Sequence, residues 1–280
     1  MSGVAQAEDP LDLSLSQAEL EAYRDHITAF IEESTDAAGV DEAIIALSGG
    51  IDSTLTAHLA VEALGADAVY GLVLPSEVNR DQNMSDAERV ASELLGIEYD
   101  VVEIGPLVDT VLESTPASMH ADDETRARTA VGNLRARLRA VLSYFAANGR
   151  NALVLGTGNR SEALVGYFTK YGDGAVDCLP IAPLYKQQVR QLARHIGVPE
   201  DLAEKTASAE LWEDQTDEQE MGVDYDTLDS ILALHVDGPL SPTATAHHIG
   251  VEVDLVERVV ELSERSAHKR EFPPGPGPLY

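Results

Sequence analysis

One hexapeptide of this sequence, Ser48-Gly49-Gly50-Ile51-Asp52-Ser53, combines residue types that bind a phosphate group. The two glycines let the backbone approach an anion closely, and the hydroxyls of Ser48, Ser53 and Thr54 add hydrogen-bond donors. A short apolar run precedes the hexapeptide and a helical pattern follows it, so the free amides of a helix start would also face the anion. The hexapeptide is therefore predicted to form a phosphate-binding loop.

Asp52 requires a separate explanation, because a carboxylate beside a phosphate is repelled unless a cation lies between them. This position therefore predicts a Mg²⁺ ion. The alternative is a carboxylate that only stabilises the helix dipole. The loop lacks the lysine and the spacing of a Walker A motif. Its S-G-G-x-D-S pattern instead resembles the pyrophosphate loop of the ATP pyrophosphatase superfamily, whose members cleave ATP between the α and β phosphates and adenylate a substrate.

The segments around this loop alternate between short apolar runs and helical periodicity. Strands are predicted at 43–47, 68–74, 99–104 and 152–155, and helices at 13–33, 52–64, 85–95 and within 125–147. This alternation is typical of a doubly wound α/β fold, in which helices cover both faces of a parallel sheet. Such folds bind ligands at the carboxyl ends of their strands, which is where the hexapeptide lies.

The chain changes character at 157–183, where Gly, Pro and polar residues are dense. Long irregular stretches of this kind are usually functional. Further helices are predicted at 184–196, 199–205, 225–234, 242–249 and 253–263. Because we find no linker and no internal repeat, we expect one domain over 1–280, with an N-terminal helix at 14–34, a nucleotide-binding core at about 40–235, and C-terminal helices and a tail at about 240–280.

Four ordered segments narrow the choice within the superfamily. They read G-T-G-N-R-S-E at 156–162, G-Y-F-T-K-Y-G-D-G at 166–174, P-I-A-P-L-Y-K at 180–186 and K-T-A-S-A-E-L at 205–211, and the triplet His268-Lys269-Arg270 follows. Together they resemble the ammonia-dependent NAD⁺ synthetases over about residues 14–270. The resemblance implies an adenine nucleotide alpha hydrolase-like fold. It also implies the final step of NAD⁺ biosynthesis, in which ATP adenylates the nicotinate carboxylate of deamido-NAD⁺, pyrophosphate leaves, and ammonia displaces AMP.

The same resemblance implies roles for individual residues. ATP would contact Ala46, Leu47, Ser48, Gly49, Gly50, Ile51, Asp52, Ser53, Thr157, Lys186 and Ser208. Mg²⁺ would be bound by Asp52 and Glu162, although Glu162 could instead cap a helix. Deamido-NAD⁺ would contact Arg137, Lys170, Asp177, His268 and Lys269. Lys186 would also serve catalysis at the phosphates.

Side chains near these segments keep two interpretations. Asp173 lies in a glycine-flanked turn, and it could shape that turn or orient and deprotonate incoming ammonium. Arg135 and Arg139 are predicted to lie on the solvated face of the long helix.

Composition limits the classes of partner. Lys and Arg number 19 against 49 Asp and Glu, so the formal net charge of the 280-residue chain is −30. Such a protein repels nucleic acids and anionic membranes, and neither is an expected partner. The charge predicts adaptation to a salty cytoplasm, where salt screens self-repulsion, although an ordinary acidic enzyme is the alternative. The single cysteine, Cys178, and the absence of a signal-peptide pattern also favour the cytoplasm.

Three other functions compete with this interpretation. A GMP synthetase would not explain the 166–174 segment, and a tRNA-thiolating enzyme would need catalytic cysteines. A non-catalytic nucleotide-binding module would not need both carboxylates, Asp52 and Glu162. The length leaves no room for an added amidohydrolase domain, so ammonia is the expected nitrogen source. The resemblance implies a homodimer, with the long helix and the N-terminal helix as candidate interface elements.

Overall fold

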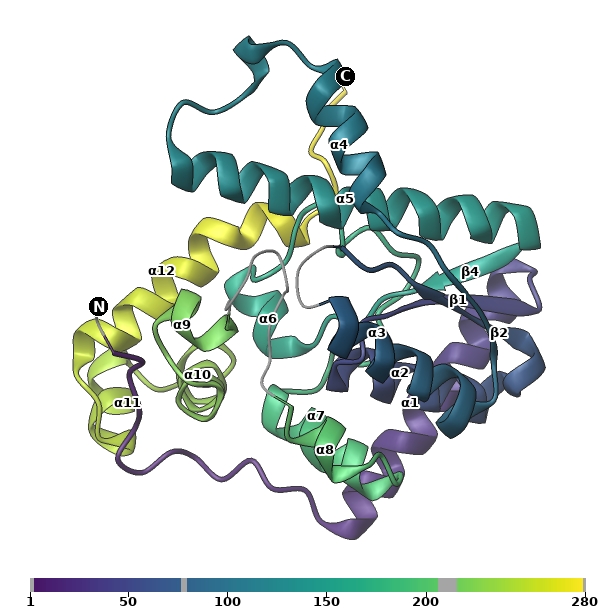
Figure 1. Ribbon diagram of the computed structural model, residues 1–280. Helices are drawn as coiled ribbons and strands as arrows, with labels where there is room; N and C mark the ends of the chain where they lie inside the picture. Colours follow the sequence, from purple (N-terminus) through teal and green to yellow (C-terminus); the bar gives the residue numbers. More distant parts are fainter. Residues whose placement is uncertain (1–2, 77–79, 206–215, 279–280) are drawn as a thin grey trace.

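The computed structural model describes residues 3–76, 80–205 and 216–278 and is organised around one parallel sheet (Figure 1). Its strands are β1 (Glu42–Leu47), β2 (Val69–Val73), β3 (Glu98–Val101) and β4 (Ala152–Leu155), in the order β3-β2-β1-β4. Every pairing is parallel. The predicted doubly wound α/β fold is confirmed, and each predicted strand is present with its bounds shifted by at most a few residues.

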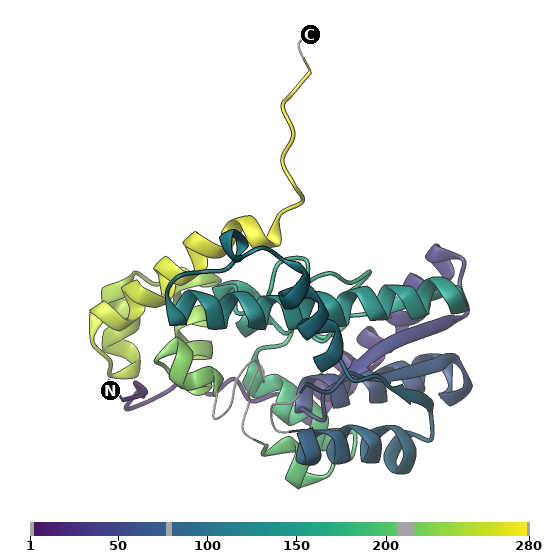
Figure 2. The same ribbon diagram turned by 45° about the horizontal axis from the view of Figure 1, so that its top comes forward.

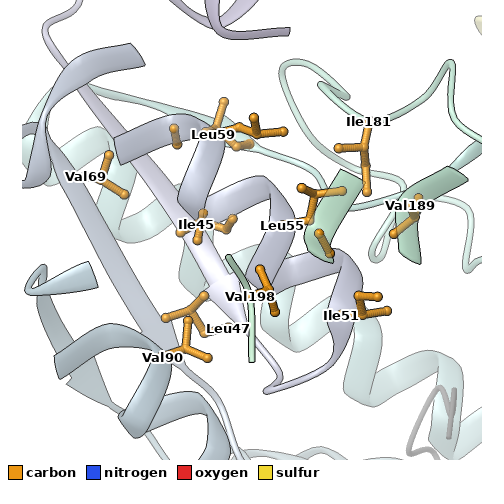
Figure 3. Close-up of a cluster of buried hydrophobic side chains, with 14 of the residues drawn as sticks. Ile45, Leu47, Ile51, Leu55, Leu59, Val69, Val90, Ile181, Val189 and Val198 are labelled. Carbon is orange, nitrogen blue, oxygen red and sulfur yellow. The ribbon is translucent and has the colours of Figure 1, made fainter. Parts of the chain in front are cut away.

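Helices cover both faces of this sheet, so the side chains of β1 are buried on both sides. Ile45 and Leu47 pack with α1 (Gln17–Ala38), α2 (Ile51–Leu64) and α7 (Lys186–His195) in one buried cluster, part of which Figure 3 shows. Ile44 points to the opposite face, where its cluster includes Ala147 of α5 (Glu124–Arg150). Successive side chains of a strand point to opposite faces, so a continuous apolar run is needed where helices cover both.

A second group of helices follows β4 and forms its own buried cluster beside the sheet. These helices are α6 (Arg160–Val165), α9 (Asp217–Met221), α10 (Tyr225–Ile231), α11 (Pro242–Ile249) and α12 (Val253–Arg270). The short helix α8 (Glu200–Ala203) also follows β4, but its buried residues belong to the cluster that contains Ile45 and Leu47. Elsewhere, α3 (Arg80–Arg89) continues into a π-helical turn at Val90–Leu95, α4 (Gly105–Ser114) packs on α5, and a π-helical turn at Leu232–Val236 extends α10.

The predicted end of the last helix was wrong. Apolar periodicity ends near residue 263, but α12 continues to Arg270. Ser266 is buried in this extension and Ser263 at its start, because small side chains let α12 pack closely on α6. A Cβ added to Gly166, the residue after α6, would lie 2.1 Å from Ser266 Cβ. The His268-Lys269-Arg270 triplet is therefore helical and held against the end of α6.

The strand order places a binding crevice between β1 and β4. From β1 the chain builds β2 and β3 on one side, and it returns to add β4 on the other. The loops after Leu47 and Leu155 therefore diverge at a topological switch point, where such folds bind ligands. Gly49 adopts φ 74°, and a Cβ at Gly156 would meet Val176 and Leu179 at 2.6 Å, so both loops depend on glycine.

No helix within residues 3–76, 80–205 and 216–278 combines the length and hydrophobicity that a bilayer crossing requires. Beyond α12, the chain extends away from the body of the protein (Figure 2).

Candidate active site

A cavity of about 680 Å³ opens at the switch point. Its walls come from the loops after β1 and β4, from one face of α5, and from the C-terminal helices. The predicted site residues that line it are Ala46, Leu47, Ser48, Gly50, Ile51, Asp52, Ser53, Thr157, Glu162, Asp173, Lys186 and Lys269. A cavity of this size, with polar groups converging on one end, is typical of a small-molecule site.

The loop after β1 is braced by its own hydroxyls. Ser53 Oγ lies 3.1 Å from Ser48 Oγ and donates to Gly50 O at 3.0 Å. The Gly50 amide donates to Ser48 Oγ at 3.2 Å. Gly50 precedes α2 and makes no side-chain cap, so the amides of the first turn of α2 are available to an anion at the cavity.

One ammonium group connects the two predicted metal ligands. Lys186 Nζ lies 2.5 Å from Asp52 Oδ2 and 3.1 Å from Glu162 Oε1. The lysine side chain is only 2% exposed, and those of Asp52 and Glu162 are 18% and 17% exposed. Burial alone would lower the pKa of Lys186, but the two carboxylates outweigh it and raise that pKa. Burial raises the pKa of Glu162, although Lys186 opposes the shift.

Asn159 joins these groups through its side-chain amide, and sequence reasoning assigned it no role. Asn159 Nδ2 donates to Asp52 Oδ1 at 2.8 Å, while its Oδ1 accepts the Glu162 amide at 3.0 Å as the N-cap of α6. The side chain is fully buried. A helix-capping asparagine three residues before Glu162 is a recognisable local signal that could have identified it.

Two further residues enclose the same carboxylates and were also missed. The Tyr225 hydroxyl lies 3.2 Å from Glu162 Oε1 and 2.9 Å from Asp217 Oδ2. The Lys186 ammonium lies 4.9 Å from the centre of the Tyr225 ring. Burial raises the pKa of Asp217 and of Tyr225. Asp217 and Tyr225 belong to α9 and α10, far along the chain, and no local motif marks them.

Asp173 fits both of its interpretations geometrically. Its Oδ1 accepts the Thr169 amide at 2.9 Å and so shapes the turn, while the residue also lines the cavity. Asp173 is exposed, but the protein atoms gathered around its carboxyl group desolvate the charged form and raise its pKa. With its pKa raised, this carboxyl group keeps its proton to a higher pH than an ordinary aspartate does.

The prediction for Arg139 was wrong. Arg139 lines the cavity, and its Nε donates to Leu74 O at 3.1 Å. Positions on the same face of α5 are small or polar and also line the cavity: Thr129, Asn133, Ala136, Ala140 and Ser143. Their helical spacing marks the face of α5 that turns toward the cavity, which the spacing of the arginines alone did not reveal. Arg135 does not line the cavity.

The residues predicted to contact deamido-NAD⁺ separate into two groups. Lys269 lines the cavity and donates to Gly166 O at 2.7 Å and to Phe168 O at 2.8 Å. The other four, Arg137, Lys170, Asp177 and His268, do not line it.

Three of these four meet at the outer surface. Arg137 Nη2 donates to Lys170 O at 3.3 Å, and Lys170 Nζ donates to His268 O. Asp177 instead accepts the Val154 amide at 2.8 Å and the Tyr144 hydroxyl at 3.0 Å. Ser208 lies outside the described residues.

The donor set around Lys186 suits a hard cation. Asp52 and Glu162 both present carboxylate oxygens to one point, and Mg²⁺ prefers oxygen ligands. In the part of the chain that the structure describes, no cluster of three or more His, Cys, Asp or Glu side chains could hold a metal ion. An ion here would take its remaining ligands from phosphate oxygens and water, as Mg²⁺ does in many nucleotide sites.

The chain is similar to several known proteins. The family model described as NAD synthase matches residues 23–273. A protein named NH(3)-dependent NAD(+) synthetase from Halobacterium salinarum is 59% identical over 95% of this chain and 97% of its own length. A solved structure of NMN synthetase from Francisella tularensis is 36% identical, with a TM-score of 0.79 over 94% of this chain and 99% of its own. An NH3-dependent NAD synthetase structure from Campylobacter jejuni is 26% identical, with a TM-score of 0.75 over 94% of this chain and 100% of its own.

Proposed function

The chain belongs to the NAD synthase family, and we propose that its cavity is the site where ATP-dependent amidation of deamido-NAD⁺ to NAD⁺ takes place. The protein is a ligase that uses ammonia and forms an adenylated intermediate. The observation that supports this site best is the convergence of Asp52, Glu162 and the Lys186 ammonium beside the glycine loop.

The reaction requires two substitutions in the same cavity. An oxygen of the nicotinate carboxylate attacks the α-phosphorus of ATP, the bond to the bridging oxygen breaks, and pyrophosphate leaves. Ammonia then attacks the activated carbonyl carbon, AMP leaves, and the nitrogen loses a proton. Because the phosphoryl step needs positioning and charge stabilisation more than covalent catalysis, cationic and amide donors are the groups to assign first.

For ATP, the proposal assigns the loop residues Ala46, Leu47, Ser48, Gly49, Gly50, Ile51, Asp52 and Ser53, together with Thr157, Lys186 and Ser208. Support comes from the free amides at the start of α2 and from the buried Lys186 ammonium beside them. Lys186 would exchange its contacts with carboxylates for contacts with phosphate oxygens, and would then stabilise the charge that develops as pyrophosphate leaves.

Mg²⁺ is the proposed cofactor, held by Asp52 and Glu162. It would supply charge neutralisation between the phosphates and these carboxylates. The residues around it do the rest: Asn159 fixes Asp52, and the Tyr225 hydroxyl restricts Glu162.

For the second step we propose that Asp173 holds ammonium and accepts its proton. Its raised pKa and its position on the cavity wall support this role. Lys269 lies on the same cavity and would contact deamido-NAD⁺. The outer residues Arg137, Lys170 and His268, and Asp177, are proposed to contact the part of the dinucleotide that extends beyond the cavity.

A homodimer would account for the placement of Arg137. Arg137, Val141 and Phe145 follow one another at four-residue spacing on α5, and Val141 and Phe145 are 61% and 77% exposed. Large exposed apolar side chains in a row favour a protein interface. If a second copy covers this row, Arg137 lies where the interface meets the dinucleotide site. Sedimentation of wild type and Phe145→Lys in molar KCl tests the dimer. If the proposed interface is correct, the variant sediments as a smaller species than wild type.

Three broader expectations accompany this assignment. We propose that residues 1–280 act as one domain, since the sheet and the C-terminal helices wall the same cavity. The net charge of −30 and the 59% identity to a protein of the halophile Halobacterium salinarum support adaptation to high salt. The single cysteine supports a cytoplasmic location.

The direct test is a turnover assay in molar KCl with ATP, MgCl₂ and either ammonium or glutamine. NAD⁺ and pyrophosphate should form in equal amounts with deamido-NAD⁺ and ammonium. The neighbour named NMN synthetase makes nicotinate mononucleotide the competing substrate to include. A higher kcat/KM for the mononucleotide than for deamido-NAD⁺ would reassign the substrate, and no pyrophosphate with either would refute the function.

A further inference from the structure

Two aspartates from the C-terminal helices each connect the start of α6 to the start of α7. They are Asp229 on α10 and Asp237, which follows the π-helical turn after α10. Neither lines the cavity. We refer to Asp229 and Asp237 together as the aspartate clamp. Its importance lies in what it holds, because α6 carries Glu162 and α7 begins with Lys186.

The inner half of the clamp is fully buried. Asp229 Oδ2 accepts the Gln187 amide at 2.9 Å, and Asp229 Oδ1 accepts the hydroxyl of Ser161. Ser161 Oγ in turn accepts the Lys186 amide at 2.9 Å. Asp229 and Ser161 are both 0% exposed. Asp229 thus accepts one of the free amides at the start of α7 directly, and it holds Ser161, which accepts another. Ser161 is also the residue preceding Glu162.

The outer half repeats this connection closer to solvent. Arg160 donates to Asp237 through Nε at 2.8 Å and through Nη2 at 2.6 Å, in a bidentate pair. The Tyr185 hydroxyl also donates to Asp237. Arg160 begins α6 and Tyr185 immediately precedes α7, so Asp237 joins the same two helix starts as Asp229.

A buried carboxylate is costly unless it pairs with donors that the fold would otherwise leave unsatisfied. Asp229 pairs with such donors, and they lie on the two helices whose side chains meet at Lys186. We propose that Asp229 is a positioning residue, which sets the distance between Glu162 and Lys186 through Ser161 and Gln187, with Asp237 as its outer support. This inference rests on the proposed roles of Glu162 at Mg²⁺ and of Lys186 at ATP.

The test compares Asp229→Asn and Asp237→Asn with Ser230→Ala. Asparagine keeps the size of Asp229 but replaces one acceptor oxygen with a donor, so it can accept from only one of its two partners. Ser230 lies beside Asp229 on α10 and is equally buried, but it pairs with the Leu11 amide at 2.8 Å, away from α6 and α7. All three variants and wild type are assayed in molar KCl, at a pH above the raised pKa of Asp229 so that both of its oxygens accept, for pyrophosphate release at varied ATP and MgCl₂, and their melting temperatures are recorded.

In Asp229→Asn, the KM for ATP and the half-saturating Mg²⁺ concentration should each rise about tenfold or more. Asp237→Asn should shift both constants in the same direction by a smaller factor. Ser230→Ala should lower only the melting temperature. The proposal would be overturned if the KM for ATP and the half-saturating Mg²⁺ concentration of Asp229→Asn were within twofold of those of Ser230→Ala. If Asp229→Asn does not fold, Asp237→Asn decides by the same criterion. Wild type that released no pyrophosphate would instead refute the proposed function, on which the clamp depends.

Discussion

The ammonium of Lys186 lies 2.5 Å from Asp52 Oδ2, although 134 positions separate the two residues in the chain. Glu162 lies on the other side of the same ammonium at 3.1 Å. The protein thus keeps a positive charge between the two carboxylates that we propose bind Mg²⁺. Binding of Mg²⁺ with ATP would replace one cation with another, so these partly buried carboxylates would keep a cation between them in both states.

Replacing that ammonium should destabilise the protein in a way that Mg²⁺ reverses. Lys186→Met leaves Asp52 and Glu162 without their cation, and breaking a buried ion pair in this way costs about 3–5 kcal/mol. Thermal melts with and without MgCl₂ measure the effect, and Mg²⁺ should recover part of the loss. In the double variant Lys186→Met/Asp52→Asn, the total loss of stability should be smaller than the sum of the losses in the two single variants. Additive losses, or no response to Mg²⁺, would contradict the arrangement.

Removing either proposed metal ligand should lower the rate of the phosphoryl step. Asp52→Asn and Glu162→Gln should each lower kcat for pyrophosphate release by about 10²-fold, because charge stabilisation at the phosphates is lost. Glu62→Gln is the matched control, since Glu62 forms an exposed ion pair with Arg24 at 2.5 Å. Equal turnover in Glu162→Gln and Glu62→Gln would argue against the metal role of Glu162.

The ammonia step should depend on pH through Asp173. The pKa of Asp173 is raised, so its carboxyl group gains a proton at a higher pH than an ordinary aspartate does. Below that pKa the neutral group no longer attracts ammonium, and the KM for ammonium should rise as the pH falls. Asp173→Asn should have a high KM for ammonium at every pH while retaining pyrophosphate release. A wild-type KM that is flat across the acid range would count against this role.

Asp229 should make stability fall with rising pH. Burial raises its pKa to about 7. The unfolded chain releases this proton near the ordinary aspartate pKa, so between the two pKa values the folded state binds more protons and the free energy of unfolding decreases with pH. The expected slope is about 1.4 kcal/mol per pH unit. Urea melts at several pH values compare wild type with Asp229→Asn, which should lack this slope. Parallel plots of unfolding free energy against pH for the two proteins would refute the role of Asp229 in this pH dependence.

Stability should increase with salt because of charge. At a formal net charge of −30 the folded chain repels itself, and salt at about 1 M shortens the screening distance to about 3 Å. The melting temperature should therefore rise by many degrees from low KCl to molar KCl. Sucrose at matched osmolality is the control, since it strengthens burial without screening charge. An equal gain in sucrose would show that screening is not the cause.

The sheet and the ligand loop could be predicted because their signals are local. Each strand is a short apolar run, and the loop at 48–53 carries its glycines and carboxylate within one segment. Glu162 and Lys186 could be placed near this loop only through resemblance. In the folded protein, Lys186 lies within hydrogen-bond distance of both Asp52 and Glu162.

The surroundings of these groups could not be predicted for a physical reason. Tyr225 and Asp217 reach the site from C-terminal helices, and Asp229 supports it from outside the cavity. Their roles depend on how those helices pack rather than on their neighbours in sequence. Arg139 was misplaced because the packing of α5 on the sheet, through residues such as Ala147, sets which face of that helix turns toward the cavity.

The close packing of Gly166 against Ser266 has a consequence for how the protein is made. Translation delivers the glycine loop early, whereas the helix carrying Lys269 emerges after every other element of the structure. A nascent chain can therefore assemble its sheet and its nucleotide loop while one side of the cavity is still missing. The side of the cavity that Lys269 lines is completed only when that last helix docks into the space left by the absent side chain of Gly166.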